Sequence, residues 1–390
     1  MTVGHMLEQD PGIRPPSRME YDEAQRKIAG ATKRDVERAL GAERIGLDEL
    51  CALLSPAADS FLEVMAVRAK ALTDARFGLT IGIYAPLYVS NHCSNRCLYC
   101  GFNAGNDIVR RSLALTEVAA EAEALARLGH RSVLLVSGDS ERFSPLPYLV
   151  DCTRVLAERF RTVHVEVASQ TTEGYRRLSD AGADGVTIYQ ETYDPDRYGE
   201  YHVAGPKRDY AFRFGAPLRA LRSGMRNVTI GPLLGLGPFE TELYWGARHL
   251  LSLRNADPAA ELGFSFPRMR PHAGGEFHYR SVSDRELVRG MLAIRLFAPW
   301  AGISVSTRES AAFRDSLTGL VATRLSAASR TTVGGYAATG DAVTEAGQFD
   351  IDDDRTVEEV VAMIRVKGRQ PIAGDWDLRF DVGEGRGMSA

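Results

Sequence analysis

The chain is short of cysteine and of long apolar segments. Five of its 390 residues are cysteine, and three of them, Cys93, Cys97 and Cys100, lie within eight positions. So few cysteines make a poor disulfide framework for a chain of this length, whereas three in one short segment suit a metal or cluster site. No apolar segment is long enough to span a bilayer, and the first twenty residues lack the apolar stretch of a signal peptide. We therefore expect a cytoplasmic protein with no membrane association.

The chain also lacks a strong excess of charge of either sign. Its formal net charge is -4, and acidic and basic residues are mixed along the sequence. A nucleic-acid-binding protein would show a basic stripe. Apolar residues make up 44% and charged residues 25%, which is typical of a globular protein with a substantial core. These values argue against a nucleic-acid partner and favour a small-molecule substrate.

Eight short β-rich segments alternate with amphipathic helical segments from residue 79 onward. The predicted strands are Leu79–Ser90, Ser132–Ser137, Val163–Ala168, Gly185–Gln190, Asn227–Gly231, Gly263–Phe266, Gly302–Ser306 and Val321–Leu325. The predicted helices between them are Thr116–Leu128, Leu146–Phe160, Thr172–Asp180, Ala211–Ser223, Glu240–Leu253, Asp284–Phe297 and Ala312–Leu317.

Strict alternation of strand and helix predicts parallel strands joined by crossover helices. Eight such strands in about 250 residues match a closed (β/α)8 TIM barrel. An open doubly wound sheet is the alternative, but the glycine-rich dinucleotide turn expected after its first strand is missing. We predict a barrel over residues 79–330, a helical N-terminal extension over residues 1–78 and a C-terminal extension over residues 331–390 that packs on the barrel.

Both extensions carry local signals. Apolar residues recur at helical spacing in Asp22–Leu40 and Gly46–Leu72, with no strand signal there. After the barrel, a helix is predicted at Thr356–Val366 and a Trp-containing end at Gly374–Phe380. The acidic segment Ile351–Arg355 lies just before that helix, so we interpret it as a solvated N-terminal cap rather than a metal site.

The three clustered cysteines directly follow the first predicted strand, at CX3CX2C spacing within NHCSNRCLYCGFN. This position is the catalytic end of a barrel. Iron–sulfur clusters of this kind are usually held by four thiolates, so three leave one iron open to another ligand. A zinc site completed by His92 is the alternative, but His92 directly precedes Cys93 and would need awkward geometry. Cys51 and Cys152 stand alone, and we expect small buried side chains without a function.

CX3CX2C after the first strand of a barrel resembles the radical S-adenosylmethionine (SAM) superfamily. The resemblance implies a [4Fe-4S] cluster on Cys93, Cys97 and Cys100, with SAM bound through its amino and carboxylate groups to the open iron. It places Tyr99 near the adenine, and Ser137, Gly138 and Asp139, after the second strand, near the SAM amino group. Glu166 on the third strand and Gln190 and Glu191 at the end of the fourth are suitable for the ribose and methionyl portions, since polar side chains at strand ends often contact ligands.

Longer stretches resemble the aromatic amino acid lyases of this superfamily. They are YAPLYVSNHCSNRCLYCGFN, DGVTIYQETYD, FPRMRP, STRES and SAASRTTVGGY, and the similarity runs from about Tyr21 to Asp375-Trp-Asp377. The branch that matures [FeFe]-hydrogenase carries further C-terminal cysteines, whereas no cysteine follows Cys152 in this chain. Two branches remain: the tyrosine lyases of thiazole biosynthesis (2-iminoacetate synthases) and the tryptophan lyases of nosiheptide-type thiopeptide biosynthesis (3-methyl-2-indolic acid synthases).

We expect the tryptophan branch, because the N-terminal segment and Thr323–Ser329 resemble it. The resemblance places Arg324, on the eighth strand, where the tryptophan lyases clamp the substrate carboxylate. A guanidinium suits that task, because its planar fork binds a carboxylate through two parallel hydrogen bonds. Tyr88 is expected to hydrogen-bond the amino acid head group, and Arg308 and Arg270 are further candidates for the carboxylate.

The resemblance also implies the reaction. An electron from a donor such as flavodoxin or ferredoxin reaches the cluster, SAM is cleaved to a 5'-deoxyadenosyl radical, and this radical takes a hydrogen from the substrate amino group. A carbon–carbon bond beside Cα then breaks. L-Tryptophan would give 3-methyl-2-indolic acid; L-tyrosine would give p-cresol and dehydroglycine. A zinc hydrolase is disfavoured because no His-x-His pair follows a strand, and a non-catalytic scaffold would not need the cysteine motif.

Overall fold

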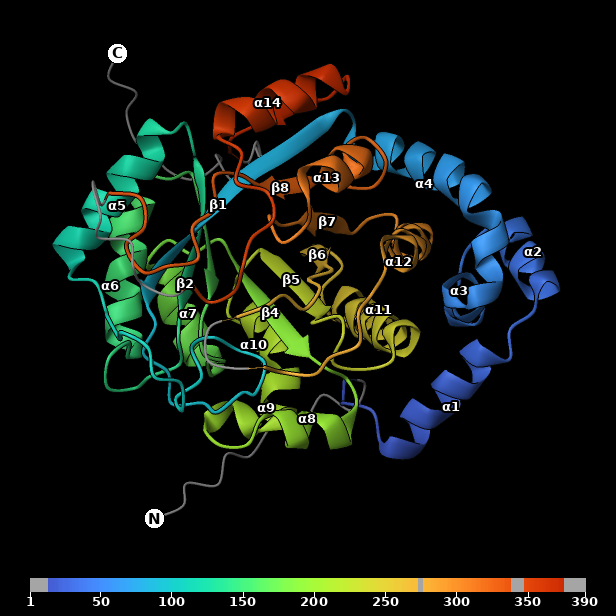
Figure 1. The fold of residues 1–390 in the computed structure, drawn as a ribbon, viewed down its shortest axis with the longest axis horizontal. Helices are drawn as coiled ribbons and strands as arrows, with labels where there is room; N and C mark the ends of the chain where they lie inside the picture. The colour runs from blue at the N-terminus through green and yellow to red at the C-terminus, as the bar shows by residue number, and fades with distance from the viewer. Residues whose placement is uncertain (1–12, 273–275, 338–346, 375–390) are drawn as a thin grey trace.

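The computed structural model describes residues 13–272, 276–337 and 347–374. Its centre is a closed barrel of eight parallel strands, in which β1 hydrogen-bonds to both β2 and β8 (Figure 1). The predicted (β/α)8 TIM barrel is therefore confirmed. The strands are β1 (Thr80–Ser90), β2 (Ser132–Ser137), β3 (Thr162–Glu166), β4 (Gly185–Glu191), β5 (Asn227–Pro232), β6 (Glu261–Ser265), β7 (Gly302–Val305) and β8 (Arg324–Ser326).

The crossover helices follow the predicted pattern with two differences. They are α5 (Leu115–Arg127), α6 (Leu146–Ala157), α7 (Thr172–Asp180), α8 (Pro195–Tyr201), α9 (Tyr210–Phe214), α10 (Ala216–Arg222), α11 (Phe239–Ala256), α12 (Asp284–Phe297) and α13 (Ala311–Leu317). The single helix predicted over Ala211–Ser223 is two helices separated by Gly215, and α8 was not predicted. Asp194 starts α8 by accepting hydrogen bonds from the backbone N–H groups of Asp196 and Arg197.

The described part of the N-terminal extension, residues 13–78, contains four helices: α1 (Arg18–Ala29), α2 (Lys33–Gly41), α3 (Leu47–Leu54) and α4 (Leu62–Phe77), with a 3-10 turn at Pro56–Phe61. The helix expected over Asp22–Leu40 is interrupted because Thr32 caps a new helix. This blue group in Figure 1 packs on α11 and α12. Among the described residues no single helix is long and apolar enough to cross a membrane, and one bent pair, Leu47–Leu54 with Pro56–Phe77, qualifies only by length and composition.

After the barrel, α14 (Val357–Val366) matches the predicted helix, and a short strand not predicted, β9 (Gln370–Ile372), adds to the start of β1. The interpretation of Ile351–Arg355 as a solvated cap is wrong for Asp353, whereas Asp352 and Asp354 are exposed. Thr356 caps α14, while Asp353 is buried and forms ion pairs with Arg314 and Arg355. Of the predicted end Gly374–Phe380, all but Gly374 lies outside the described residues. The boundaries at residues 78 and 330 stay a prediction.

Candidate active site

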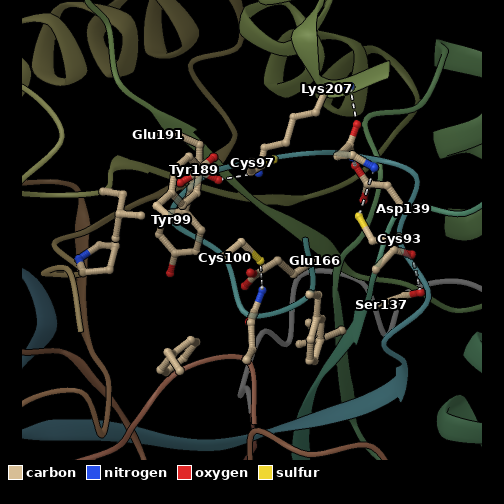
Figure 2. Close-up of a pocket in the computed structure, with 18 of the residues that line it drawn as sticks. Cys93, Cys97, Tyr99, Cys100, Ser137, Asp139, Glu166, Tyr189, Glu191 and Lys207 are labelled. Carbon is tan, nitrogen blue, oxygen red and sulfur yellow. Dashed lines mark hydrogen bonds and ion pairs between the residues drawn. The ribbon is translucent and has the colours of Figure 1, made fainter. Parts of the chain in front are cut away.

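The three clustered cysteines lie on the loop that leaves the C-terminal end of β1. Backbone hydrogen bonds join this loop to the segment after α8: Arg96 N–H donates to Ala204, and Val203 N–H donates back to Arg96. The loop is therefore held in one conformation by a neighbouring segment. Figure 2 shows Cys93, Cys97 and Cys100 around one pocket.

This pocket contains about 880 Å³ of empty space, its open mouth included. It lies over the carboxyl ends of the strands, where barrel enzymes carry their active sites. Most of the residues proposed from the sequence line it: Cys93, Cys97, Tyr99, Cys100, Ser137, Gly138, Asp139, Glu166, Glu191, Arg270 and Arg308. The structure thus brings together residues from six different strand ends.

The loop after β2 packs tightly against the cysteine loop. Position 138 requires glycine, because a Cβ on Gly138 would lie 2.4 Å from the His92 carbonyl oxygen. Next to it, the Asp139 carboxylate accepts a hydrogen bond from the Asn95 amide at 2.7 Å, and its carbonyl accepts one from Ser94 N–H. These contacts hold Asp139 at the edge of the pocket, beside Cys93.

Glu191 and Lys207 form an ion pair at 2.6 Å on the wall of the pocket. Glu191 has a φ of 71°, a strained conformation for a residue other than glycine, and such strain is concentrated at functional sites. Burial favours neutral forms of both groups, but their mutual attraction outweighs it: the pKa of Lys207 is raised and that of Glu191 is lowered. Arg213 lies 4.0 Å from the same carboxylate. The pair is therefore charged at neutral pH.

Glu166 faces the same pocket from β3, and its pKa is shifted in the opposite direction to that of Glu191. Burial, and then repulsion from Glu191, raises the pKa of Glu166 to about 7. The two carboxylates therefore differ at neutral pH: Glu191 is ionised, whereas Glu166 exchanges its proton in the physiological range.

Tyr99 is fixed by its hydroxyl group, which lies 2.6 Å from Nε2 of His202. Burial lowers the pKa of His202 to about 3, so the imidazole is neutral. Its Nδ1 lies 2.7 Å from the Tyr198 carbonyl oxygen and must donate there, so Nε2 accepts from Tyr99. The Tyr99 ring is held on the pocket wall, with the Lys207 ammonium 5.8 Å from its centroid.

Two of the three proposed carboxylate-binding arginines reach the pocket. Arg270 is paired with Asp352 at 2.7 Å. Arg308 stacks over the Phe349 ring, 3.3 Å from its centroid, and no described acidic side chain lies within ion-pair distance of it. Burial lowers the pKa of Arg308, which means that its charge is incompletely compensated. Of Arg270 and Arg308, Arg308 is therefore the better candidate to bind an anionic ligand.

Arg324 does not line the pocket, and its expected role as a clamp for the substrate carboxylate stays a prediction. It lines a separate cavity together with Asn227, Glu261 and Gly302, each the first residue of its strand. That cavity is at the amino-terminal end of the barrel. The physical reason is the register of β8: the strand begins at Arg324, whereas the predicted strand Val321–Leu325 placed this residue near its end.

Gln190 and Tyr88 also do not line the pocket. Gln190 alternates with Tyr189 and Glu191, which face inward, so its buried amide points away from the barrel interior. Among the described residues, its side-chain amide has no hydrogen-bond partner. Tyr88 lies just behind the pocket wall, where its hydroxyl donates to Oε1 of Gln348 at 2.8 Å.

Sequence reasoning missed Lys207, Arg213, Gln348 and Phe349, all of which line the pocket. Lys207 lies in a short 3-10 helix and Arg213 in α9, both between β4 and β5, and the last two come from the C-terminal extension. Neither region has the periodic pattern that marks a strand end. The segment GPKRD around Lys207 carried a turn signal only.

The cysteine loop fits a [4Fe-4S] cluster better than a single metal ion. No three His, Cys, Asp or Glu side chains of the described residues converge closely enough to hold one ion. The His92 ring stacks on Phe143 with centroids 3.8 Å apart and does not line the pocket. Burial raises the pKa of all three thiols, that of Cys93 to about 11, so their thiolate forms need cationic iron. Cys51 and Cys152 are buried elsewhere.

Comparisons with known proteins agree with this geometry. The model of the radical SAM superfamily matches residues 87–244, and that of the Biotin and Thiamin Synthesis associated domain matches residues 265–370. The 2-iminoacetate synthases of Escherichia coli (strain K12) and Salmonella typhimurium are each 39% identical over 360 residues, 92% of this chain and 95% of theirs.

Solved structures show the same fold. A crystal structure of HydG, a maturase of the [FeFe]-hydrogenase, superposes with a TM-score of 0.84 at 30% identity, over 91% of this chain and 80% of that one. Methylornithine synthase (PylB) superposes with a TM-score of 0.69 at 21% identity, over 87% of this chain and 97% of that one, which shows a shared fold only.

Barrel, thiol loop and strand-end pocket together define an enzyme that binds a [4Fe-4S] cluster and SAM. The chain belongs to the radical SAM superfamily, in its branch of aromatic amino acid lyases.

Proposed function

We propose that the chain is a tyrosine lyase of the 2-iminoacetate synthase type, which cleaves L-tyrosine to p-cresol and dehydroglycine. The observation that carries this proposal is the 39% identity to 2-iminoacetate synthase over 92% of the chain and 95% of the relative. The tryptophan reaction was expected from the resemblance of the N-terminal segment and of Thr323–Ser329 and from Arg324, and Arg324 does not line the cysteine pocket. The tyrosine alternative is therefore the better supported of the two.

In this proposal the cluster and SAM supply a 5'-deoxyadenosyl radical when bound. Cys93, Cys97 and Cys100 hold the cluster, while Asp139 and the Glu191–Lys207 pair bind the polar part of SAM. Tyr99 offers an aromatic wall for the adenine. These assignments use the charges and positions of the pocket residues and the family pattern together.

The substrate carboxylate is assigned to Arg308 in place of Arg324. Arg308 lines the pocket, and its guanidinium is partly held by the Arg268 carbonyl at 3.3 Å and by the Phe349 ring. A fixed guanidinium places a carboxylate in a defined orientation, and a radical reaction needs the amino group to be held close to the abstracting carbon. Arg308 thus orients the substrate and takes no part in proton transfer.

A product assay tests the proposal. The protein is purified anaerobically, its iron and sulfide are measured, and it is incubated with SAM, a one-electron donor such as flavodoxin or ferredoxin, and either L-tyrosine or L-tryptophan. We expect p-cresol from tyrosine at a rate well above any formation of 3-methyl-2-indolic acid from tryptophan. The reverse preference would overturn the tyrosine assignment and restore the tryptophan one.

A further inference from the structure

A segment of the C-terminal extension crosses the mouth of the pocket. Residues 347–355, which we call the strap, are tied by backbone hydrogen bonds to the loops after four strands, β1, β6, β7 and β8. Asp350 N–H donates to the Pro271 carbonyl, and Asp352 N–H donates to that of Thr307. Gln348 and Phe349 of the strap contribute side chains to the pocket wall. The strap therefore forms part of the site although it lies outside the barrel.

Gln348 uses every one of its polar groups. Its backbone N–H donates to the Thr331 carbonyl at 3.0 Å, and its carbonyl accepts from Gly101 N–H at 3.3 Å. Its side-chain Oε1 accepts from the Tyr88 hydroxyl at 2.8 Å, and its Nε2 donates to Sγ of Cys100 at 3.8 Å. Because Oε1 accepts the hydrogen bond from the Tyr88 hydroxyl, the Nε2 end of the amide is directed toward the Cys100 sulfur.

The cysteine loop is shaped to admit this contact. Gly101 follows Cys100 directly, and a Cβ at this position would lie 2.6 Å from the Gln348 carbonyl oxygen. The two backbones can approach only because Gly101 has no side chain. Tyr88 is buried and meets the Phe102 ring edge to face at 5.9 Å, so the group that orients the amide is itself fixed.

We propose that Gln348 is a positioning residue for the cluster, whose amide N–H bonds to the Cys100 sulfur and raises the reduction potential. A hydrogen bond to a cluster sulfur stabilises the reduced state more than the oxidised one, because reduction adds negative charge that the sulfurs share. Tyr88 acts through Gln348 by fixing the direction of the amide. The inference rests on the assignment of Cys93, Cys97 and Cys100 to the cluster and is independent of the amino acid substrate.

The test is a redox titration of the reconstituted full-length protein, followed by the electron paramagnetic resonance signal of the reduced cluster. Gln348→Met preserves the length of the side chain but removes the donor, and the midpoint potential should become more negative. Gln348→Glu keeps an acceptor for Tyr88 while it replaces the donor with a negative charge, so a larger shift in the same direction is expected. Tyr88→Phe frees the amide and should give a smaller shift with the same sign.

Gln170→Met is the matched control, because the Gln170 amide donates to the Ala168 carbonyl and does not line the pocket. Its midpoint should equal that of the wild type. Iron and sulfide are measured in every variant. Unchanged midpoints in Gln348→Met and Tyr88→Phe at wild-type iron content would overturn the proposal, and if Gln348→Met fails to assemble a cluster, Tyr88→Phe decides. A wild-type protein without iron and sulfide would instead overturn the cluster assignment itself.

Discussion

Two arginines illustrate how far the position of a single side chain decides its role. Arg308 and Arg324 both follow or belong to barrel strands, and both carry a guanidinium suited to a carboxylate. Arg308 faces the cysteine pocket, whereas Arg324 lies among the first residues of its neighbouring strands, 5.9 Å from the Tyr84 ring centroid. We therefore expect opposite consequences when each is changed.

Arg308→Lys should keep the positive charge but lose the planar fork. A charge-assisted hydrogen bond contributes about 1.5–3 kcal/mol, so the KM for the amino acid should rise roughly tenfold to a hundredfold. SAM affinity should change little. Steady-state kinetics with varied tyrosine, together with SAM binding, would measure both. Arg324→Lys is the control, and a larger effect on KM from Arg324→Lys than from Arg308→Lys would contradict the assignment.

The cysteines give the second prediction at this scale. Replacement of Cys93, Cys97 or Cys100 by Ala removes a cluster ligand that water cannot replace without making the cluster labile. Iron content and 5'-deoxyadenosine formation should both be lost. Cys51→Ala and Cys152→Ala should retain both, since these thiols are buried away from the pocket. Wild-type SAM cleavage in any variant of the first three would show that the loop does not hold the cluster.

At the scale of elements, the strap depends on a buried ion cluster. Asp353 is 1% exposed and pairs with the fully buried Arg314, and with Arg355 at 2.7 Å. Arg314 also donates to the Ser326 carbonyl at the end of β8. The cluster thus fastens the strap to the same strand end that borders the site.

Asp353→Asn should destabilise the protein strongly, because it leaves the Arg314 charge buried without its carboxylate. Breaking a buried ion pair in this way costs about 3–5 kcal/mol. Urea unfolding would measure the loss. Asp354→Asn, at the exposed neighbouring position, is the matched control and should stay within about 0.5 kcal/mol of the wild type. Equal stability of the two variants would mean that the strap is held by other contacts.

The same elements show what the sequence could and could not predict. Strands and crossover helices were predictable because burial imposes a period on them: the side chains along most of β1 alternate between half-buried and buried. The strap and the segment around Lys207 have no such period, since backbone hydrogen bonds between distant segments shape them. The eighth strand is only three residues long and begins three positions later than predicted, so Arg324 is its first residue and not one near its end.

At the scale of the whole molecule, the barrel interior is unusually polar. Barrels are usually filled with bulky branched side chains, whereas His164, Thr187, Thr229, Ser304 and Arg324 surround the space at mid-height here. The sequence contained this information, because these residues alternate with apolar ones on their strands. The alternation alone does not say which set of side chains faces the barrel interior, and the structure shows that it is the polar set.

Buried histidines make the stability of the whole molecule sensitive to acid. His130, His202 and His249 are each at most 2% exposed, and burial lowers their pKa values to about 4, 3 and 3. An unfolded histidine has a pKa of about 6.5, so between pH 6.5 and 4 the unfolded chain binds more protons than the folded one. Each of these histidines therefore makes the free energy of unfolding fall as the pH falls through that window.

Glu166 and Glu242, whose pKa values are raised to about 7, have the opposite effect on the free energy of unfolding between pH 4.5 and 7.

His249→Phe isolates one of these contributions. The His249 ring stacks on Phe214 with centroids 4.0 Å apart, so phenylalanine preserves the stack and removes the titrating nitrogens. Relative to the wild type, the variant should gain stability below pH 6.5 by up to about 1.4 kcal/mol per pH unit, whatever constant offset it shows at pH 7.5. Urea unfolding of the cluster-free protein between pH 4.5 and 7.5 measures this difference. His278→Phe, at an exposed position, is the control for the loss of an imidazole as such. Parallel stability curves for His249→Phe and the wild type would mean that His249 binds its proton equally well in the folded and unfolded chains, and that its burial does not govern the acid sensitivity of the molecule.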